Sequence, residues 1–270
     1  MRWITGMWAE MVKSHQHNFH SKMIYFSLLI WPVLLFLTSY YSLKPFNLEA
    51  TSPIAEFVDP DSIMLFLLTG FLGYIFFWSL VQSAWQTSYE RQTGTLELIF
   101  LTPVSRLAFV YGRSAGNLFE AAWLFTVFSV LLLVALGGPQ SIIWSALPIA
   151  FLILIISAVV WGGFLNVVFL FSRDASILFT ILEEPMQFFA GVRLPVAAFP
   201  IWGKVIAVVF PLTFVLDIFR GLVIKGQHLS QLSTSLFILA GILIGLIFLT
   251  TLLMKLAEKH AKQSGNMVLF

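Results

Sequence analysis

The chain has 270 residues, of which 59% are hydrophobic and only 10% are charged, whereas soluble domains usually carry about 25% charged residues. Its formal net charge is +2 and it contains no cysteine, so disulfide bonds and thiolate metal sites are excluded. Several apolar runs reach the ~20 residues that an α-helix needs to cross a bilayer. The composition therefore predicts an all-α polytopic membrane protein that forms a single domain over residues 1–270.

The first 22 residues predict an amphipathic helix that lies on the inner membrane surface. Its apolar side chains recur at helical spacing, and polar side chains occupy the opposite face. Three histidines lie in this segment, His15, His17 and His20. Because positions 15 and 17 point about 200° apart on a helix, the three cannot converge on one ion, and no metal site is predicted.

Six transmembrane helices are predicted next, at residues 24–43, 62–86, 108–136, 142–171, 175–189 and 233–256. Lys and Arg favour the cytosolic side of a multi-pass protein. Placing both termini in the cytosol puts ten of the 15 Lys and Arg residues there. The ten are Arg2, Lys13, Lys22, Arg91, Arg106, Arg113, Arg173, Lys255, Lys259 and Lys262.

Residues 88–106 form a charged cytosolic loop between the second and third predicted spans. Within it, residues 96–101 predict a short helix that is apolar on almost every face. Thr93 or Thr95 is expected to cap its start, and Gly94 permits a sharp change of direction. A two-turn helix is marginal in water. We therefore expect it to dock, either on lipid or on a partner protein.

The fifth predicted span is interrupted at Pro185 and is followed by a Pro/Gly-rich apolar segment, residues 190–222. Irregular backbone at membrane depth is tolerated only where protein or a water-filled cavity shelters it. The segment therefore predicts re-entrant helices that enter from the outer face.

Glu183 and Glu184 precede that interruption, and intramembrane carboxylates are expected to have a function. The alternative is that they are hydrated, or paired with Arg193 or Arg220. The other span centres are expected to lack ionisable residues, which disfavours an ion-coupled carrier. The sequence has no G-x-x-x-x-G-K-[ST] motif, so any ATP is bound by another chain.

The loop reads Glu90-Arg91-Gln92-Thr93-Gly94-Thr95-Leu96-Glu97 and then Thr102-Pro103-Val104-Ser105-Arg106. That pattern resembles the first cytosolic loop of ABC type-2 exporter permeases. Further residues resemble the outer segment of the same family: Gly191, Leu194-Pro195, Phe199-Pro200, Phe210-Pro211-Leu212-Thr213 and Arg220. The resemblance covers nearly the full chain.

The resemblance implies that the loop carries a coupling helix seated in an ATP-binding subunit. The implied contact residues are Glu90, Arg91, Thr93, Gly94, Thr95, Leu96, Glu97, Leu98 and Pro103. The candidates for an outer gate are Glu183, Glu184, Pro195, Pro200 and Pro211. A weaker hypothesis places a substrate pathway at Phe77, Trp78, Trp161 and Asn166, although such aromatics also face lipid and such amides also join helices.

The expected function is that of a permease subunit of an ATP-driven exporter, located in the plasma (inner) membrane. Its expected partners are two ABC ATPase subunits, which bind ATP and Mg, a second permease copy or paralogue, and membrane lipids. No enzyme activity of its own, no cofactor and no nucleic acid is expected. An amphipathic drug, peptide or lipid-like substrate is favoured over a polysaccharide or lipid-linked glycan. The remaining alternatives are a membrane-embedded enzyme and a non-transporting scaffold.

Overall fold

The computed structural model describes residues 2–18, 22–43, 63–96, 98, 102–135, 143–171 and 175–264. Throughout these residues the regular structure is helical, which confirms the predicted all-α class. The α-helices are α1 (Arg2–Asn18), α2 (Lys22–Leu43), α3 (Ile63–Gln92), α5 (Arg106–Gly116), α6 (Leu118–Ala135), α7 (Leu147–Phe171), α8 (Ala175–Phe189), α9 (Ile201–Val209), α10 (Pro211–Val223) and α11 (Ser233–Ser264). Short 3-10 helices lie at Trp144–Ala146 and Val196–Ala198.

Three of the described helices are long and apolar enough to cross a membrane, in agreement with a multi-pass membrane protein. They are Ile63–Glu90 in α3, Leu147–Leu170 in α7 and Ser233–Lys259 in α11. The pair α9 and α10, bent by 93°, adds a fourth candidate span or a re-entrant loop. These match the second, fourth and sixth predicted spans and the predicted segment 190–222. The first predicted span corresponds to a shorter apolar helix, Phe26–Ser42.

Two predicted helix boundaries differ from the structure. The third predicted span is divided into α5 and α6 at Asn117, whose side-chain amide donates a 2.8 Å hydrogen bond to the carbonyl of Ser79 in α3. Conversely, α8 continues through Pro185, where an interruption was predicted. A proline removes one backbone hydrogen bond from a helix, and in α8 that loss does not end the helix.

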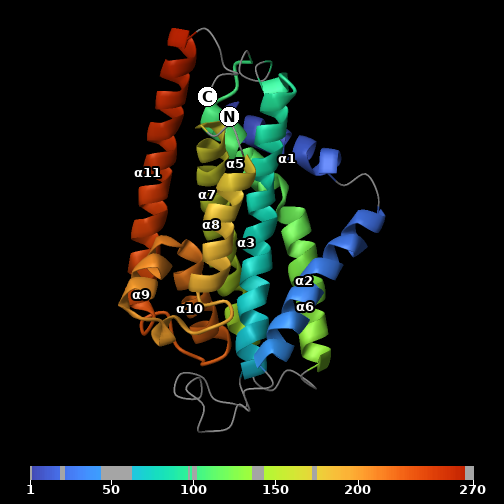
Figure 1. Ribbon diagram of the computed structural model, residues 1–270, viewed down its shortest axis with the longest axis vertical. Coiled ribbons are helices and arrows are strands. Elements are labelled where there is room, and N and C mark those ends of the chain that lie inside the picture. The colour runs from blue at the N-terminus through green and yellow to red at the C-terminus, as the bar shows by residue number, and fades with distance from the viewer. Residues whose placement is uncertain are drawn as a thin grey trace.

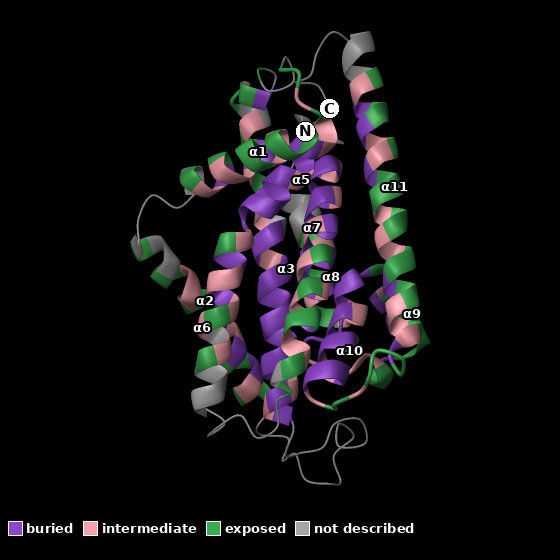
Figure 2. Cartoon of the chain, turned by 180° about the vertical axis from the view of Figure 1, so that it is seen from behind, coloured by how far each residue is buried: buried purple, intermediate pink, exposed green. Residues whose placement is uncertain are grey.

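The helices form an elongated bundle with α3 near its centre (Figure 1). In an apolar stretch of 18 residues, 83% of the residues of α3 are buried, against 11% of those of α11. α3 is therefore the core helix, and α11 lies at the periphery. Figure 2 shows the same contrast between the two helices. α1 and the C-terminal ends of α3 and α11 lie at one end of the bundle, which we call the α1 end; α9 and α10 lie towards the other.

α1 packs directly on α5. Because Gly112 lacks a side chain, the two helices can approach closely: a Cβ atom there would lie 2.6 Å from the carbonyl oxygen of Met7. Glu10 and Ser14 of α1 are buried, whereas Trp3 and Trp8 are 44% and 60% exposed. A helix is therefore present over the predicted segment and two of its polar residues face protein, while its place on a membrane surface stays a prediction.

Candidate functional site

The end of α3 and the loop that follows form the first part of the candidate site. Gly94 adopts a φ of 73°, which confirms that glycine allows the sharp change of direction. The hydroxyls of Thr93 and Thr95 donate to the carbonyl of Glu90, at 3.2 and 3.1 Å. These threonines therefore cap the C-terminus of α3, and the cap that one of them was expected to form at the start of a following helix stays a prediction, because that segment continues into residues outside the described part.

Two leucines of the loop point in opposite directions. Leu96 is only 4% exposed and belongs to a hydrophobic cluster with Phe109, Val110, Val167, Leu170 and Met254. Leu98 is 66% exposed. Thr95, Leu96 and Leu98 are helical, whereas Glu97 and residues 99–101 lie outside the described residues, as does the side chain of Arg91. Leu96 thus anchors the loop to α5, α7 and α11, while Leu98 presents an apolar side chain outward.

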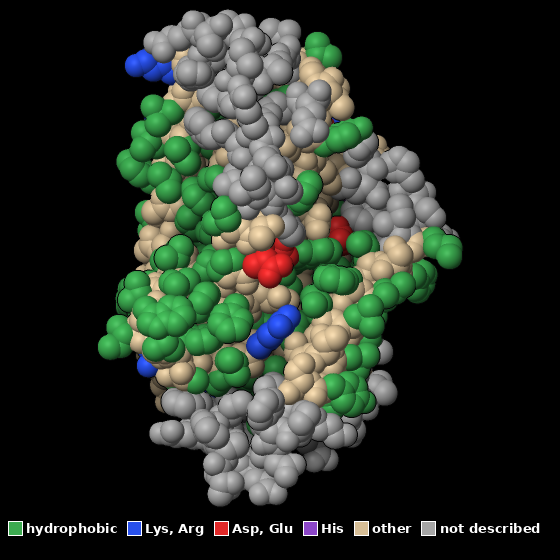
Figure 3. All heavy atoms as spheres, in the orientation of Figure 1, with side chains coloured by type: hydrophobic (Ala, Val, Ile, Leu, Met, Phe, Trp, Pro, Cys, Tyr) green, Lys and Arg blue, Asp and Glu red, His purple; other side chains and the backbone are tan. Residues whose placement is uncertain are grey.

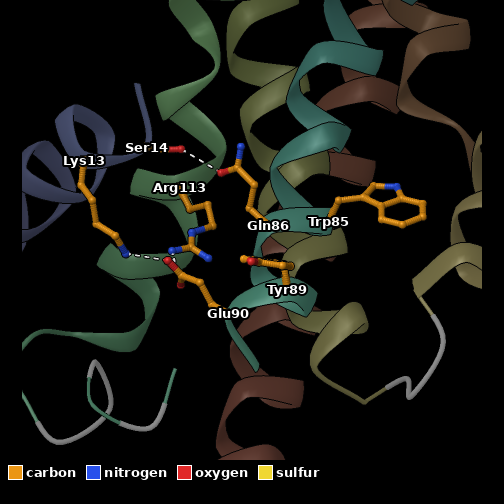
Figure 4. A pocket seen from close by; sticks show the side chains of 7 residues that line it. All are labelled: Lys13, Ser14, Trp85, Gln86, Tyr89, Glu90 and Arg113. Atoms are coloured by element: carbon orange, nitrogen blue, oxygen red, sulfur yellow. Dashed lines mark hydrogen bonds and ion pairs between the residues drawn. The ribbon is translucent and has the colours of Figure 1, made fainter. Parts of the chain in front are cut away.

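A buried arginine joins the last turn of α3 to α1 and α5 (Figure 4). Arg113 is 1% exposed. Its guanidinium donates from Nε and Nη2 to Oε1 of Glu10 and from Nη2 to Oε2 of Glu90. Lys13 donates to the other oxygen of Glu90 at 2.8 Å. We call these four residues, Glu10, Lys13, Glu90 and Arg113, the Arg113 junction.

The charges of the Arg113 junction balance, because two cations face two carboxylates. Each carboxylate contacts both cations, with Lys13 at 3.4 Å from Glu10. Removing one member of a buried ion pair leaves an uncompensated charge and is strongly destabilising. A pocket of about 310 Å³ lies beside the junction, and its wall also includes Ser14 of α1 and Trp85, Gln86 and Tyr89 of α3.

A second hydrogen-bonded chain extends the junction to α7. Nη1 of Arg113 donates to the hydroxyl of Thr87 at 3.3 Å, and that hydroxyl donates to Oδ1 of Asn166. The Asn166 amide donates in turn to Ser83 and to the carbonyl of Gly162, both at 2.8 Å. Asn166 thus joins α3 to α7, and its proposed place in a substrate pathway stays a prediction.

The start of α5 is also tied to α11. Nε of Arg106 lies 3.5 Å from a carboxylate oxygen of Glu258, and both side chains are partly exposed. The same arginine donates to the carbonyls of Thr102 and Val104, at 3.2 Å each. Together with Leu96, this contact holds the described part of the loop against α5 and α11.

The other predicted site residues lie farther along the bundle. Glu183 is 5% exposed and accepts a 2.6 Å hydrogen bond from the Tyr74 hydroxyl, whereas Glu184 is exposed. Pro195, Pro200 and Pro211 immediately precede or begin the 3-10 turn, α9 and α10, respectively. Arg220 donates to Thr69 and to the carbonyls of Phe66 and Gly191. Phe77 and Trp161 are buried in the core and Trp78 is partly buried.

Sequence analysis missed the buried charged residues Glu10, Arg113 and Glu120. Arg113 was counted only as a cytosolic cation, yet its position just inside the third predicted span indicated that it needed a partner. Glu120 lies in α6 and is 5% exposed, so the expectation that the other span centres lack ionisable residues is wrong. Glu10 and Lys13, three residues apart on α1, were the available signal for a charged face.

The chain matches no protein-family model and no curated protein sequence. In the described part of the structure, no group of three or more His, Asp or Glu residues is arranged to hold a metal ion. The polar residues at the α1 end instead connect helices to one another. The loop, α1, α3, α5 and α7 are joined by one continuous set of ion pairs and hydrogen bonds at the α1 end.

Proposed function

We propose that this chain is the membrane-spanning permease subunit of an ABC exporter, and that an ATP-binding subunit drives it through the loop after α3. The observation that carries the proposal is the orientation of the two loop leucines. Leu96 is fixed in the hydrophobic cluster at the ends of α5, α7 and α11, and Leu98 is exposed beside it. An exposed apolar side chain on an anchored turn is available to enter a groove of a partner protein.

The Arg113 junction supports the same proposal. The last turn of α3 carries Glu90, and its carboxylate is held by Arg113 of α5 and Lys13 of α1. A displacement of the loop therefore moves α1, α3 and α5 together, because breaking the junction would leave buried charges unpaired. In this mechanism the ATP-binding subunits supply the force and α3 acts as the lever.

The test is ATP hydrolysis by the chain purified with a candidate ABC-type ATP-binding subunit from the same genome, in lipid nanodiscs with Mg-ATP. Leu98→Asp charges the exposed loop side chain. Leu229→Asp is the matched control, because Leu229 is 41% exposed in the turn before α11, away from the α1 end. We expect Leu98→Asp to separate the two subunits or to abolish stimulation of hydrolysis by the permease, and Leu229→Asp to leave both intact.

Retention of complex and activity in Leu98→Asp would mean that the loop rests on lipid, and the proposal would fail. It would also fail if wild-type chain and the ATP-binding subunit did not associate. Equal loss in both variants would show a general effect of an added charge, which likewise contradicts docking through Leu98. A thermal unfolding measurement on each variant separates loss of docking from loss of fold.

A further inference from the structure

The pocket beside the Arg113 junction is lined by side chains of α1, α3 and α5 (Figure 4). Its volume of about 310 Å³ lies at the lower end of the ~300–1,000 Å³ that ligand pockets in proteins occupy. It therefore has room for a small polar group, such as the headgroup of a lipid, but not for a whole lipid. The charge of its wall and its depth along α3 determine which group fits.

The four charges of the junction balance, but a ligand does not meet them equally. Of the Lys13 side chain 45% is exposed, against 10% for Glu10 and 18% for Glu90. The wall of the pocket contains Lys13, Arg113 and Glu90 but not Glu10. A group that enters the pocket therefore meets more positive than negative charge.

The wall also offers several hydrogen-bond donors. The ammonium of Lys13 has three N–H groups, and its contacts with two carboxylates occupy two of them. The amide oxygen of Gln86 accepts from Ser14 at 3.1 Å, so the amide nitrogen is the end that can donate to a ligand. The hydroxyl of Tyr89, a residue that is 60% exposed, can donate as well. A phosphate, which is negatively charged and has several acceptor oxygens, fits this wall.

The pocket lies at the end of a candidate membrane span. Trp85, Gln86, Tyr89 and Glu90 line it, and they belong to the last two turns of Ile63–Glu90, a span of 28 residues. A helix of that length is about 42 Å long, whereas the hydrocarbon core is about 30 Å thick. Centred in the bilayer, the span extends about 6 Å beyond the core at each end, which is the depth of lipid headgroups.

Exposed aromatic rings mark the same depth. Trp85 and Tyr89, four residues apart on one face of α3, are 39% and 60% exposed. Tryptophan and tyrosine are enriched where a membrane meets water. Figure 3 shows hydrophobic side chains over much of the described surface between the two ends of the bundle, as expected for a surface that contacts acyl chains. A lipid can therefore place its headgroup in the pocket while its chains remain in the bilayer.

We propose that this pocket binds the phosphate of an anionic phospholipid from the leaflet at the α1 end. The phosphate accepts from Lys13 and from the amide of Gln86, and Arg113 contributes its charge. Basic pockets between membrane helices hold anionic headgroups in this way. The bound lipid joins α1 to α3 beside the junction. The inference does not depend on the proposed exporter function, and its test needs no ATP-binding subunit.

The test is lipid binding to the purified full chain in detergent micelles, counted by native mass spectrometry. Phosphatidylglycerol and phosphatidylcholine with the same acyl chains are compared. We expect the first phosphatidylglycerol to bind at least about fivefold more tightly, which is the contribution of one cation near a membrane surface. Equal affinity for the two lipids would overturn the proposal.

Gln86→Glu tests the pocket without removing an ion pair. The variant keeps the oxygen that accepts from Ser14 and replaces the donor nitrogen by a negatively charged oxygen. It should weaken binding of phosphatidylglycerol about tenfold or more, because like charges then meet at contact distance. Gln231→Glu is the matched control: Gln231 is exposed in the turn before α11, and its oxygen also accepts a hydrogen bond. Unchanged binding in Gln86→Glu would contradict the site.

Lys13→Gln removes the accessible cation and should also weaken binding about tenfold, because a charge-assisted contact is lost. Lys13→Arg keeps the charge and should retain most of the binding. The control is Lys255→Gln, which removes an exposed lysine of α11 towards the same end of the bundle and should leave binding unchanged. Equal losses in Lys13→Gln and Lys255→Gln would show a general effect of surface charge and would overturn the proposal.

Soluble phosphates separate a lipid site from a site for a free anion. Glycerophosphoglycerol has the headgroup of phosphatidylglycerol without its acyl chains. It and inorganic phosphate should bind far more weakly than the intact lipid, because the chains hold the headgroup at the depth of the pocket. If either soluble phosphate bound as tightly as the lipid, the lipid assignment would fail. None of these results depends on Leu98, so the lipid site and the exporter mechanism can fail independently.

Discussion

The Arg113 junction and the Glu183–Glu184 pair both place carboxylates in an apolar protein, and they differ in how those carboxylates are satisfied. In the junction, both carboxylates contact both cations, and the guanidinium of Arg113 also reaches Thr87. In α8, Glu183 accepts from Tyr74 alone among the described residues, and its second oxygen is buried without a partner there. A fully satisfied network holds helices together, whereas a buried carboxylate with an unpaired oxygen contributes little to the stability of the fold.

The largest effect on stability is expected from a substitution that breaks the Arg113 junction. Arg113→Met removes one of the two cations that Glu10 and Glu90 share and leaves both carboxylates with Lys13 alone. The expected loss is about 3–5 kcal/mol in the free energy of unfolding, because one negative charge in a partly buried site is then uncompensated. Denaturant titration of the purified protein in mixed micelles measures it.

The matched control restores the charge balance of the junction. Adding Glu10→Gln to Arg113→Met leaves Lys13 facing Glu90 and should recover more than half of the loss, since no buried charge is then left unpaired. A single Arg113→Met that unfolds at the wild-type denaturant concentration would mean that the junction does not hold α1, α3 and α5 together.

The next effect sharpens the contrast within the loop. Leu96→Ala opens space in the cluster with Phe109 and Met254 and should destabilise by about 2–4 kcal/mol, as for other buried leucines. Leu98→Ala should change the free energy of unfolding by less than about 0.5 kcal/mol, because that side chain is exposed. The same titration distinguishes them, and similar losses in both would contradict the opposite orientations of the two leucines.

The same chemical change should then have different results in the two charged regions. Glu90→Gln weakens charge-assisted bonds from Arg113 and Lys13 and should cost about 1.5–3 kcal/mol of stability. Glu183→Gln should cost less than about 1 kcal/mol, because the amide oxygen still accepts from Tyr74 and a poorly satisfied charge disappears. Parallel titrations compare the two variants; an equal or larger loss for Glu183→Gln would contradict the distinction between the two charged regions.

How far the sequence predicts this fold depends on the range of the interactions involved. The helices of α3, α7 and α11 follow from apolar runs, and the turn at Gly94 follows from a local backbone requirement. The roles of Thr93 and Thr95 did not follow, because a threonine hydroxyl can accept at a helix start or donate at a helix end. Which it does depends on whether α3 ends nearby, and α3 extends to Gln92, beyond the predicted end of its span.

The Arg113 junction lay beyond sequence reasoning for a different reason. Arg113 meets a glutamate 103 residues away and another 23 residues away, on two other helices. No periodicity within one helix encodes such a meeting, and only the close packing of α1 on Gly112 brings Glu10 within reach. The division at Asn117 has the same origin, since its amide bonds to a carbonyl of α3.

The smallest effect is expected at the ion pair between Arg106 and Glu258, where 25% and 34% of the side chains remain exposed. An exposed pair of this kind contributes about 0.2–1 kcal/mol, so Glu258→Gln should barely change the unfolding titration. A double-mutant cycle with Arg106→Met isolates the pair, and its coupling should shrink further as salt is raised, because exposed charges are screened. A coupling above about 2 kcal/mol would contradict this view of a weak surface contact.

Since the pair joins the start of α5 to α11 but adds little stability, any larger effect of Glu258→Gln on ATP hydrolysis must arise from transmission between the loop and α11. The same variant thereby separates the mechanical role of the α1 end from its contribution to the fold.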